Sequence, residues 1–443
     1  MAALLEAARR RNPLPTGTLA VGAGLLVAGL SAYGFLAIAN RPLSDAEYSP
    51  LSATWSLVFL VGPGLFLPLE QEISRALSAR RTRGQGGAPV VRRAATLGVG
   101  LGLAVLVLLI ATARLSVDHL FDGHILLLVG LALGISGALA GHITRGCLSG
   151  TGHFRGYATY IGADGFIRLL GCALCAAIGV TTAGWYGIAL GAAGLLAVPV
   201  ALRVERPGLD EGPESTMREI GSALGFLLMA SLFAFGLMNI GPVIVKLLAS
   251  DGEADAAGRF VNGVVIARIP LFLFQAVQAS LLPRLSALAS AGRLGDFRIG
   301  LKRLMVVVAG LAVAGTLVGA VLGPAVVDIM FPGADLGHRT MGLLAAGSGV
   351  YMLALACAQA VIALGGHRDQ ALGWGLGMVG LGVATWVSSD DLFLRVEIGL
   401  LVGSLVAFVS MAVLLVRRLL VAGPLPVDSG DFIEALHDVP IEA

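Results

Sequence analysis

The sequence predicts an all-α polytopic membrane protein with about 12 transmembrane helices, arranged as two six-helix lobes around a central cavity. Three observations predict this fold class. Of the 443 residues, 56% are hydrophobic and only 13% are charged, whereas soluble domains carry about 25% charged residues. Apolar runs of about 20 residues, long enough to cross a bilayer, follow one another along the whole chain. Finally, short motifs of the first half recur in the second half.

Apolar runs separated by charged residues predict the individual helices in order along the chain. The first run, 16–39, is longer than the apolar core of a cleaved signal peptide, so we expect it to remain as a helix. The seventh and ninth runs are long enough to tilt or to extend beyond the membrane. The predicted helices lie at 16–39, 51–71, 94–113, 125–143, 157–180, 183–202, 221–249, 260–283, 301–328, 340–364, 370–388 and 394–416.

The distribution of arginine and lysine predicts the orientation in the membrane. If the amino terminus is cytoplasmic, most of the 30 basic residues fall in inner segments, most densely in 75–93 and 284–303. Cytoplasmic loops of membrane proteins carry such an excess. The outer loops then hold only Arg41, Arg114, Arg259, Arg339 and Arg395. This asymmetry predicts an even number of spans, with both ends of the chain in the cytoplasm. We expect the membrane to be the plasma (inner) membrane.

Two recurring motifs predict that the halves are parallel repeats. An Arg-rich exit follows the second and the eighth predicted helices, and a Gly-His pair occurs at 152–153 and again at 366–367. Both halves begin inside, so the repeat relates two lobes about the membrane normal. The predicted organisation is an N-terminal lobe at 1–202, a cytoplasmic linker at 203–220, a C-terminal lobe at 221–420 and a cytoplasmic tail at 421–443.

Arg268 is the first candidate for the substrate-binding site. It would lie near the middle of the eighth predicted helix, with Gln275 and Gln278 on the same face, and the adjacent Pro270 can open the backbone hydrogen bonding there. A charged side chain at the bilayer centre costs about 2.5–3.5 kcal/mol, so it usually faces a cavity or a partner. The three side chains therefore predict a polar stripe facing a cavity; a structural ion pair between helices is the alternative.

Five further polar residues inside predicted helices are also candidates for substrate binding. Asp164 and Arg168 have the i, i+4 spacing of a helical ion pair, so self-neutralisation is the first interpretation. Asn239 and Lys246 share a helix face, but Lys246 lies near the outer end and could extend to the membrane surface. Glu70, at the inner end of the second predicted helix, either balances neighbouring arginines or reaches the central cavity.

Motifs for cofactors, metals and catalysis are absent from the sequence or lie in unsuitable places. Cys172 and Cys175 form a C-x-x-C in an apolar segment without partner ligands, so we interpret them as packing residues. The G-x-G-x-x-G at 375–380 lies inside a predicted helix with no preceding strand and is better explained by close helix packing. We expect no cofactor and no metal, and the net charge of +2 gives no reason to expect nucleic acid.

Several segments together resemble the polysaccharide-biosynthesis (Wzx-like) branch of the MOP flippase superfamily. The resemblance spans most of the chain as a pattern of spacing and short motifs, carried by 51–57, 69–75, 145–152, 239–242 and 260–284. It implies two lobes around a cavity that opens alternately to each side and moves lipid-linked oligosaccharides, typically on undecaprenyl diphosphate, to the outer leaflet. The implied partners are membrane lipid, the polyprenyl-linked glycan, a polysaccharide polymerase and glycosyltransferases.

The sequence departs from two other branches of that superfamily. Its first predicted helix contains no charged residue, unlike MATE-like drug exporters and lipid II flippases, and it has twelve predicted helices rather than the fourteen of the latter. We therefore expect a flippase, not an enzyme, in which the Arg268 guanidinium holds phosphate oxygens of the cargo. A membrane glycosyltransferase or ligase that uses Asp45 and Glu47 of the first outer loop is an alternative, as is a scaffold protein that transports nothing.

Overall fold

The computed structural model describes residues 18–216, 221, 224–253, 255–271, 274, 288–289 and 291–421. Within these ranges the secondary structure is entirely helical. The first half contains α2 (Thr18–Ala39), α3 (Asp45–Thr82), α4 (Ala88–Ala111), α5 (Ala113–His119), α6 (Ile125–Gly150), α7 (Phe154–Ala177) and α8 (Ala183–Val204). The second half contains α9 (Leu224–Asn239), α10 (Gly241–Leu248), η1 (Asp251–Glu253), α11 (Ala256–Ala267), α13 (Leu294–Met330), α14 (His338–Ala363), α15 (His367–Val387) and α16 (Leu392–Val421).

The described part of the chain has the helices of a multi-pass membrane protein. Nine of its helices are long and apolar enough to cross a membrane, and the bent pair of α9 and α10 makes a tenth span. The helices α15 and α11 begin close to the predicted starts of the eleventh and eighth spans. The predicted all-α polytopic fold class is therefore confirmed.

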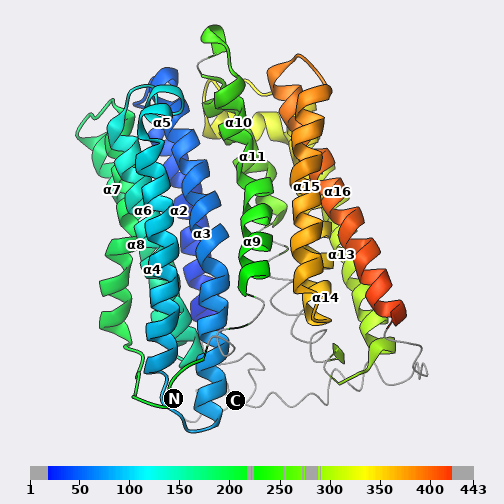
Figure 1. Ribbon diagram of the computed structural model, residues 1–443. Helices are drawn as coiled ribbons and strands as arrows, with labels where there is room; N and C mark the ends of the chain where they lie inside the picture. The colour runs from blue at the N-terminus through cyan, green and yellow to red at the C-terminus, as the bar shows by residue number, and fades with distance from the viewer. Residues whose placement is uncertain are drawn as a thin grey trace, which may run out of the picture.

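The helices form two lobes (Figure 1). In the first lobe α2 packs on α7, and α6 packs on both α3 and α8; in the second, α14 packs on α13 and α16, and α15 packs on α16. The lobes meet where α3 of the first lobe lies along α9 of the second. The predicted linker at 203–220 begins in the last turn of α8, while 217–220 and the predicted tail beyond 421 lie outside the described residues.

The helix α3 is longer than predicted at both ends. It begins directly after Ser44, whose side chain accepts a hydrogen bond from the backbone N–H of Glu47 (3.4 Å), the geometry of an N-cap. It then continues through the charged segment 70–82, where the prediction had ended it at 71. The prediction was wrong here because it equated the helix with its membrane-embedded part. Charged residues end the part that lies in the membrane, but the helix itself can continue beyond it.

The seventh predicted helix, 221–249, is also wrong as a single element. The chain bends by 60° between α9 and α10, at Ile240. The cause is local, because Pro242 has no N–H with which to continue the α9 hydrogen-bond ladder and Gly241 tolerates the close approach of Phe260. The bend places the end of α9 next to the end of α11.

The eighth predicted helix is interrupted at Arg268: α11 ends at Ala267, Arg268 is its C-cap residue, and residues 269–271 are helical again. Pro270 follows two positions later, which is common after a helix C-terminus. The helix thus presents its last turn, with Arg268, to the broken helix α9–α10.

Close packing of α6 on α8 depends on glycine. A Cβ atom at Gly191 would lie 1.9 Å from the carbonyl oxygen of Gly130, and one at Gly130 would lie 2.4 Å from that of Gly187. Backbone atoms cannot move aside as a flexible side chain can, so these positions exclude larger residues. Small residues bring membrane helices together in this way because lipid supplies no hydrophobic force between them.

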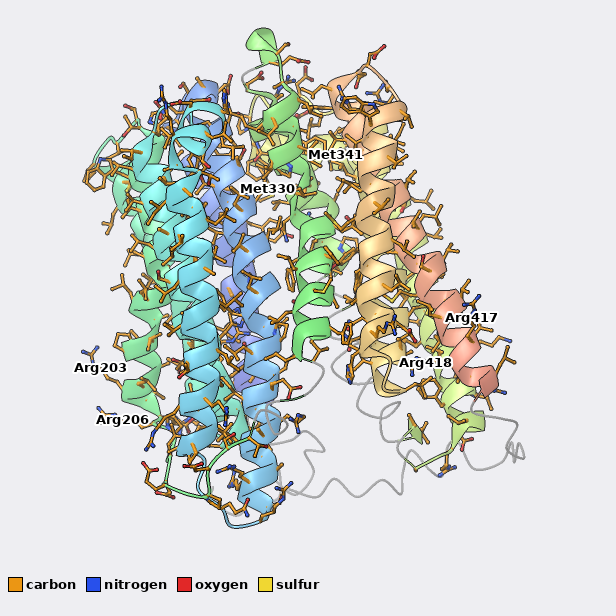
Figure 2. All side chains as sticks on the ribbon, in the orientation of Figure 1. Arg203, Arg206, Met330, Met341, Arg417 and Arg418 are labelled. Atoms are coloured by element: carbon orange, nitrogen blue, oxygen red, sulfur yellow. The ribbon has the colours of Figure 1, made fainter. Side chains whose placement is uncertain are left out.

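The arginine-rich helix ends gather at one end of the molecule. Figure 2 shows Arg203, Arg206, Arg417 and Arg418 toward that end, while Met330 and Met341 lie toward the other. Segments from both lobes therefore contribute to the same basic face, as expected for a cytoplasmic side.

This arrangement leads to a labelling prediction. Single cysteines at the exposed positions Gln85 and Lys302 should react with a membrane-impermeant maleimide only from the cytoplasmic side, once the four native cysteines are replaced by serine. A cysteine at the exposed Ser388, in the loop between α15 and α16, should react only from outside. Labelling of intact cells and of inverted vesicles measures both, and reaction of Gln85→Cys from outside would contradict the orientation.

Candidate functional site

The contact between Arg268 and Asn239 is the centre of the candidate site. Arg268 Nη1 donates a hydrogen bond to Asn239 Oδ1 at 3.1 Å. The amide nitrogen of Asn239 donates in turn to the carbonyl of Phe235 (3.0 Å), in its own helix, and to the carbonyl of Phe59 (3.4 Å), in α3 of the other lobe. Asn239 is therefore held by backbone atoms of both lobes, and it orients Arg268 at their junction.

A pocket with about 400 Å³ of empty space, including its open mouth, lies beside Arg268. Its walls come from α9, α11, α14 and α16 and are mainly apolar. The polar groups are Arg268, Ser348, Tyr351 and Ser404, and among the described residues no carboxylate lines the pocket. Tyr351 already donates its hydroxyl proton to the carbonyl of Ala234 (3.2 Å). The pocket thus offers one cation and a few hydroxyl groups in an apolar setting.

Arg268 differs from the other basic residues that were singled out within the predicted helices. Arg168 pairs with Asp164 at 2.5 Å, and Lys246 pairs with Asp122 at 2.6 Å. Within the part of the chain that the structure describes, Arg268 has no carboxylate at ion-pair distance; its hydrogen-bond partner is the neutral Asn239. An unpaired cation at membrane depth is costly, so this guanidinium is the group with most to gain from an anionic ligand.

The Asp164–Arg168 pair lies on α7 of the first lobe, as its spacing predicts. The Arg168 guanidinium stacks over the ring of Phe59 (5.0 Å to the centroid) and lies 5.8 Å from that of Trp55. Phe59 also accepts the hydrogen bond from Asn239. Phe59 thus links the Arg168 pair of one lobe to the Asn239–Arg268 contact of the other.

Glu70 is surrounded by donors from its own lobe. Its carboxylate lies 2.7 Å from Nδ1 of His142 and 2.6 Å from the Arg145 guanidinium, and it accepts a hydrogen bond from the Tyr157 hydroxyl at 3.1 Å. Glu70 is only 5% exposed. Its oxygens are thus satisfied within the N-terminal lobe, which favours a structural role over contact with cargo.

Lys246 joins the two lobes at the end opposite the basic face. Its ammonium pairs with Asp122, which lies in the loop between α5 and α6 of the first lobe, and only 8% of the Lys246 side chain is exposed. Tyr48 of α3 donates to Asn262 of α11 at 2.7 Å, a second tie between the lobes on that side. The ends of the lobes opposite the basic face are therefore closed against each other in this structure.

The remaining candidates are placed as follows. Gln275 and Gln278 lie outside the described residues, so their predicted stripe is not placed. Leu271, three residues after Arg268, is buried and lines the Arg268 pocket. Sequence reasoning missed Ser348, Tyr351 and Ser404, although polar residues at i, i+3 in one predicted apolar helix are a signal for a polar face.

The first outer loop of the prediction is the first turn of α3. Glu47 accepts a hydrogen bond from the backbone N–H of Ala183 (2.6 Å), at the start of α8, and lies 3.3 Å from Nε2 of His124. The carboxylate thereby caps α8, because helix N-termini leave N–H groups unsatisfied. Among the described residues no group of three His, Cys, Asp or Glu side chains could hold a metal ion.

The sequence matches no protein-family model and no curated protein. Its fold is similar to solved structures of MOP superfamily transporters. An inward-facing multidrug resistance MATE family transporter has a TM-score of 0.69 and 13% identity, over 89% of this chain and 94% of that one. A Vibrio cholerae MATE transporter has a TM-score of 0.65 and 17% identity, over 92% and 99%. A MOP superfamily transporter from Pyrococcus furiosus, described by the reverse polarity of its binding pocket, has a TM-score of 0.67 and 13% identity, over 90% and 94%.

Proposed function

We propose that the protein is a plasma-membrane transporter that works by alternating access between its two lobes. Its cargo is a polyprenyl-diphosphate-linked oligosaccharide, which it flips from the inner to the outer leaflet for surface polysaccharide biosynthesis, as Wzx-like flippases do. The observation that carries this proposal is Arg268, a cation without a carboxylate partner among the described residues, at the junction of the two lobes.

The chemistry of Arg268 favours a diphosphate. Guanidinium presents N–H donors in a planar fork that matches phosphate oxygens, and a charged hydrogen bond of this kind is about twice as strong as a neutral one. Asn239 accepts a hydrogen bond from Nη1 of Arg268 and so orients the guanidinium. The hydroxyl groups of Ser348 and Ser404 in the same pocket can donate to further phosphate oxygens. The apolar walls strengthen each of these interactions by excluding water.

The same features disfavour the two alternatives. A cationic drug would meet the uncompensated charge of Arg268 in a pocket whose described lining has no carboxylate, and like charges repel. A glycosyltransferase that uses both Asp45 and Glu47 would need both carboxylates free; Asp45 is exposed, but Glu47 is engaged in capping α8. The Pyrococcus furiosus protein, whose reverse pocket polarity suggests a different function, is a precedent for other cargo on this fold.

The proposal implies partners of a particular kind. The cargo is amphipathic, so its polyprenyl tail remains in bilayer lipid beside the lobes while the diphosphate binds at Arg268. Glycosyltransferases must build the glycan on the inner leaflet, and a polysaccharide polymerase must use it on the outer leaflet.

Mass spectrometry of co-purifying lipid tests this function directly. Wild-type protein extracted in mild detergent should carry a polyprenyl-diphosphate glycan, and Arg268→Ala should carry much less of it, because the phosphate ligand is lost. Lys302→Ala, at an exposed position of α13, is the matched control and should retain the lipid. Equal lipid on all three proteins, or a bound lipid without phosphate, would contradict the assignment of the site.

A further inference from the structure

Glu397 of α16 is a buried acid that takes no part in the proposed binding of cargo. The residue is 0% exposed, and among the described residues its carboxylate has no ion-pair partner and no hydrogen bond of good geometry. Glu397 contrasts with Glu70, another buried glutamate, whose oxygens meet three side chains. It therefore requires a separate explanation.

The part of α16 that carries Glu397 packs in a mainly apolar cluster. The adjacent Val396 packs with Val245 of α10, Phe260 of α11 and Leu344 of α14 in one buried cluster. The neighbouring polar groups on α14 are the hydroxyl of Thr340, which is itself buried, and the guanidinium of Arg339.

The charged groups on the helices around Glu397 are engaged elsewhere. The contacts are Arg339 with Asp391 (3.5 Å), Arg395 with the carbonyl oxygen of Thr385 (3.4 Å), Lys246 with Asp122 (2.6 Å) and Arg259 with Asp255 (2.6 Å). An ionised carboxylate without a partner in an apolar environment is so costly that it takes up a proton instead. Glu397 is accordingly a neutral acid in this conformation.

Glu397 also lies on the helix faces that form the Arg268 pocket. On α16 it precedes Leu400 and Ser404 by three and seven positions, and both residues line that pocket. On α14, Leu344 both lines the pocket and belongs to the buried cluster next to Glu397. Glu397 therefore lies near the outer ends of α14 and α16, and the Arg268 pocket lies further along the same two helices.

The helix α10, which packs on α16 in the cluster that contains Val396, also carries an interlobe contact. Val245 of α10 packs in the cluster beside Glu397, and the next residue, Lys246, forms the ion pair with Asp122 of the other lobe. Separation of the lobes at this end must break that pair and pull on α10. Such a movement would admit water to Glu397.

We propose that Glu397 is a proton-binding site that links closure of the outer end to proton uptake; this inference rests on the alternating access of the proposed function. When the outer end closes, the Glu397 carboxylate takes a proton from outside water and becomes neutral. When it opens, the hydrated acid returns the proton to that water. Because the closed state binds the extra proton, low pH stabilises it and rising pH favours opening.

An infrared measurement tests proton binding without any transport. Protein labelled with ¹³C-glutamate should show the isotope-shifted carbonyl band of a neutral carboxylic acid, and Glu397→Gln should lack that component. Glu253→Gln is the control, because hydrogen bonds from Ser250 hold the pKa of the exposed Glu253 below its ordinary value, so it contributes no neutral acid. A wild-type spectrum identical to that of Glu397→Gln would overturn the proton site.

A distance measurement tests the link to closure. Spin labels on cysteines at the exposed outer positions His119 and Ser388 report the separation of the lobes in a cysteine-free background. The fraction with long distances should rise with pH in the parent protein, whereas Glu397→Gln, which resembles the neutral acid, should stay closed throughout. An identical pH response in both proteins would overturn the link. One closed distance under every condition, with the infrared band present, would instead show that alternating access fails while Glu397 still binds a proton.

Discussion

Arg268→Ala is expected to abolish flipping of a polyprenyl-diphosphate-linked oligosaccharide while the protein remains folded. A hydrogen bond to a charged group contributes about 1.5–3 kcal/mol, so loss of two such bonds to phosphate lowers transport by about 100-fold or more. The fold should survive, because no described carboxylate pairs with Arg268 and only Asn239 loses a donor. Transport is measured with fluorescent lipid-linked oligosaccharide in proteoliposomes, alongside thermal stability in detergent.

Arg268→Lys is the informative partner of that variant. It keeps the charge but replaces a planar fork with a single ammonium, so transport should be partial. Asn239→Ala should have a smaller effect than Arg268→Ala, because it misorients the guanidinium without removing it. A stable and fully active Arg268→Ala protein would remove Arg268 from the substrate site.

Glu70→Ala is expected to have the opposite profile, a large loss of stability. Removing the carboxylate leaves His142, Tyr157 and the Arg145 guanidinium without their shared acceptor in the N-terminal lobe. Breaking a buried ion pair in this way typically costs about 3–5 kcal/mol. The melting temperature in detergent should fall markedly, and transport should fall in proportion to the folded fraction. Glu70→Gln, which still accepts hydrogen bonds, should be less affected.

Glu72→Ala is the matched control for Glu70. Glu72 is the next acid along α3; its own side chain is 11% exposed, and it pairs with Arg75, whose side chain is 53% exposed. Water screens a pair with one exposed partner and weakens it, so the melting temperature should fall less than in Glu70→Ala. A stable Glu70→Ala protein that has nevertheless lost transport would place Glu70 in the path of the cargo, the second interpretation that its sequence position allows.

The membrane class of the fold follows from local properties of the chain. Apolar length, arginine distribution and repeated motifs can all be recognised in the sequence without knowing which helices pack together. The bilayer also imposes the same requirement on every span. These signals predict the helical class, the two lobes and the shared basic face, all of which the described helices display. They also single out Arg268 and Asn239, since polar residues within apolar runs stand out without any knowledge of packing.

Helix ends and breaks are less well predicted, because several local effects compete there. The N-cap Ser44 extends α3 beyond its apolar part. The Gly-Pro at 241–242 belongs to the segments that carry the family resemblance, yet the apolar run through it suggested one continuous helix. The missing N–H of Pro242 outweighed hydropathy and divided the span, which placed Asn239 next to Arg268.

The amino-acid sequence by itself determined that this protein lies in a membrane, how its spans follow one another and which residues are costly to bury there. Only the tertiary structure decided which of those residues have partners. Glu70 meets Arg145 and Lys246 meets Asp122 across long stretches of chain, whereas Glu397 meets no ion-pair partner among the described residues, although all three are ionisable residues in apolar runs of the sequence. The physical reason is that hydropathy measures the cost of removing each group from water, while compensation depends on neighbours that only helix packing brings together.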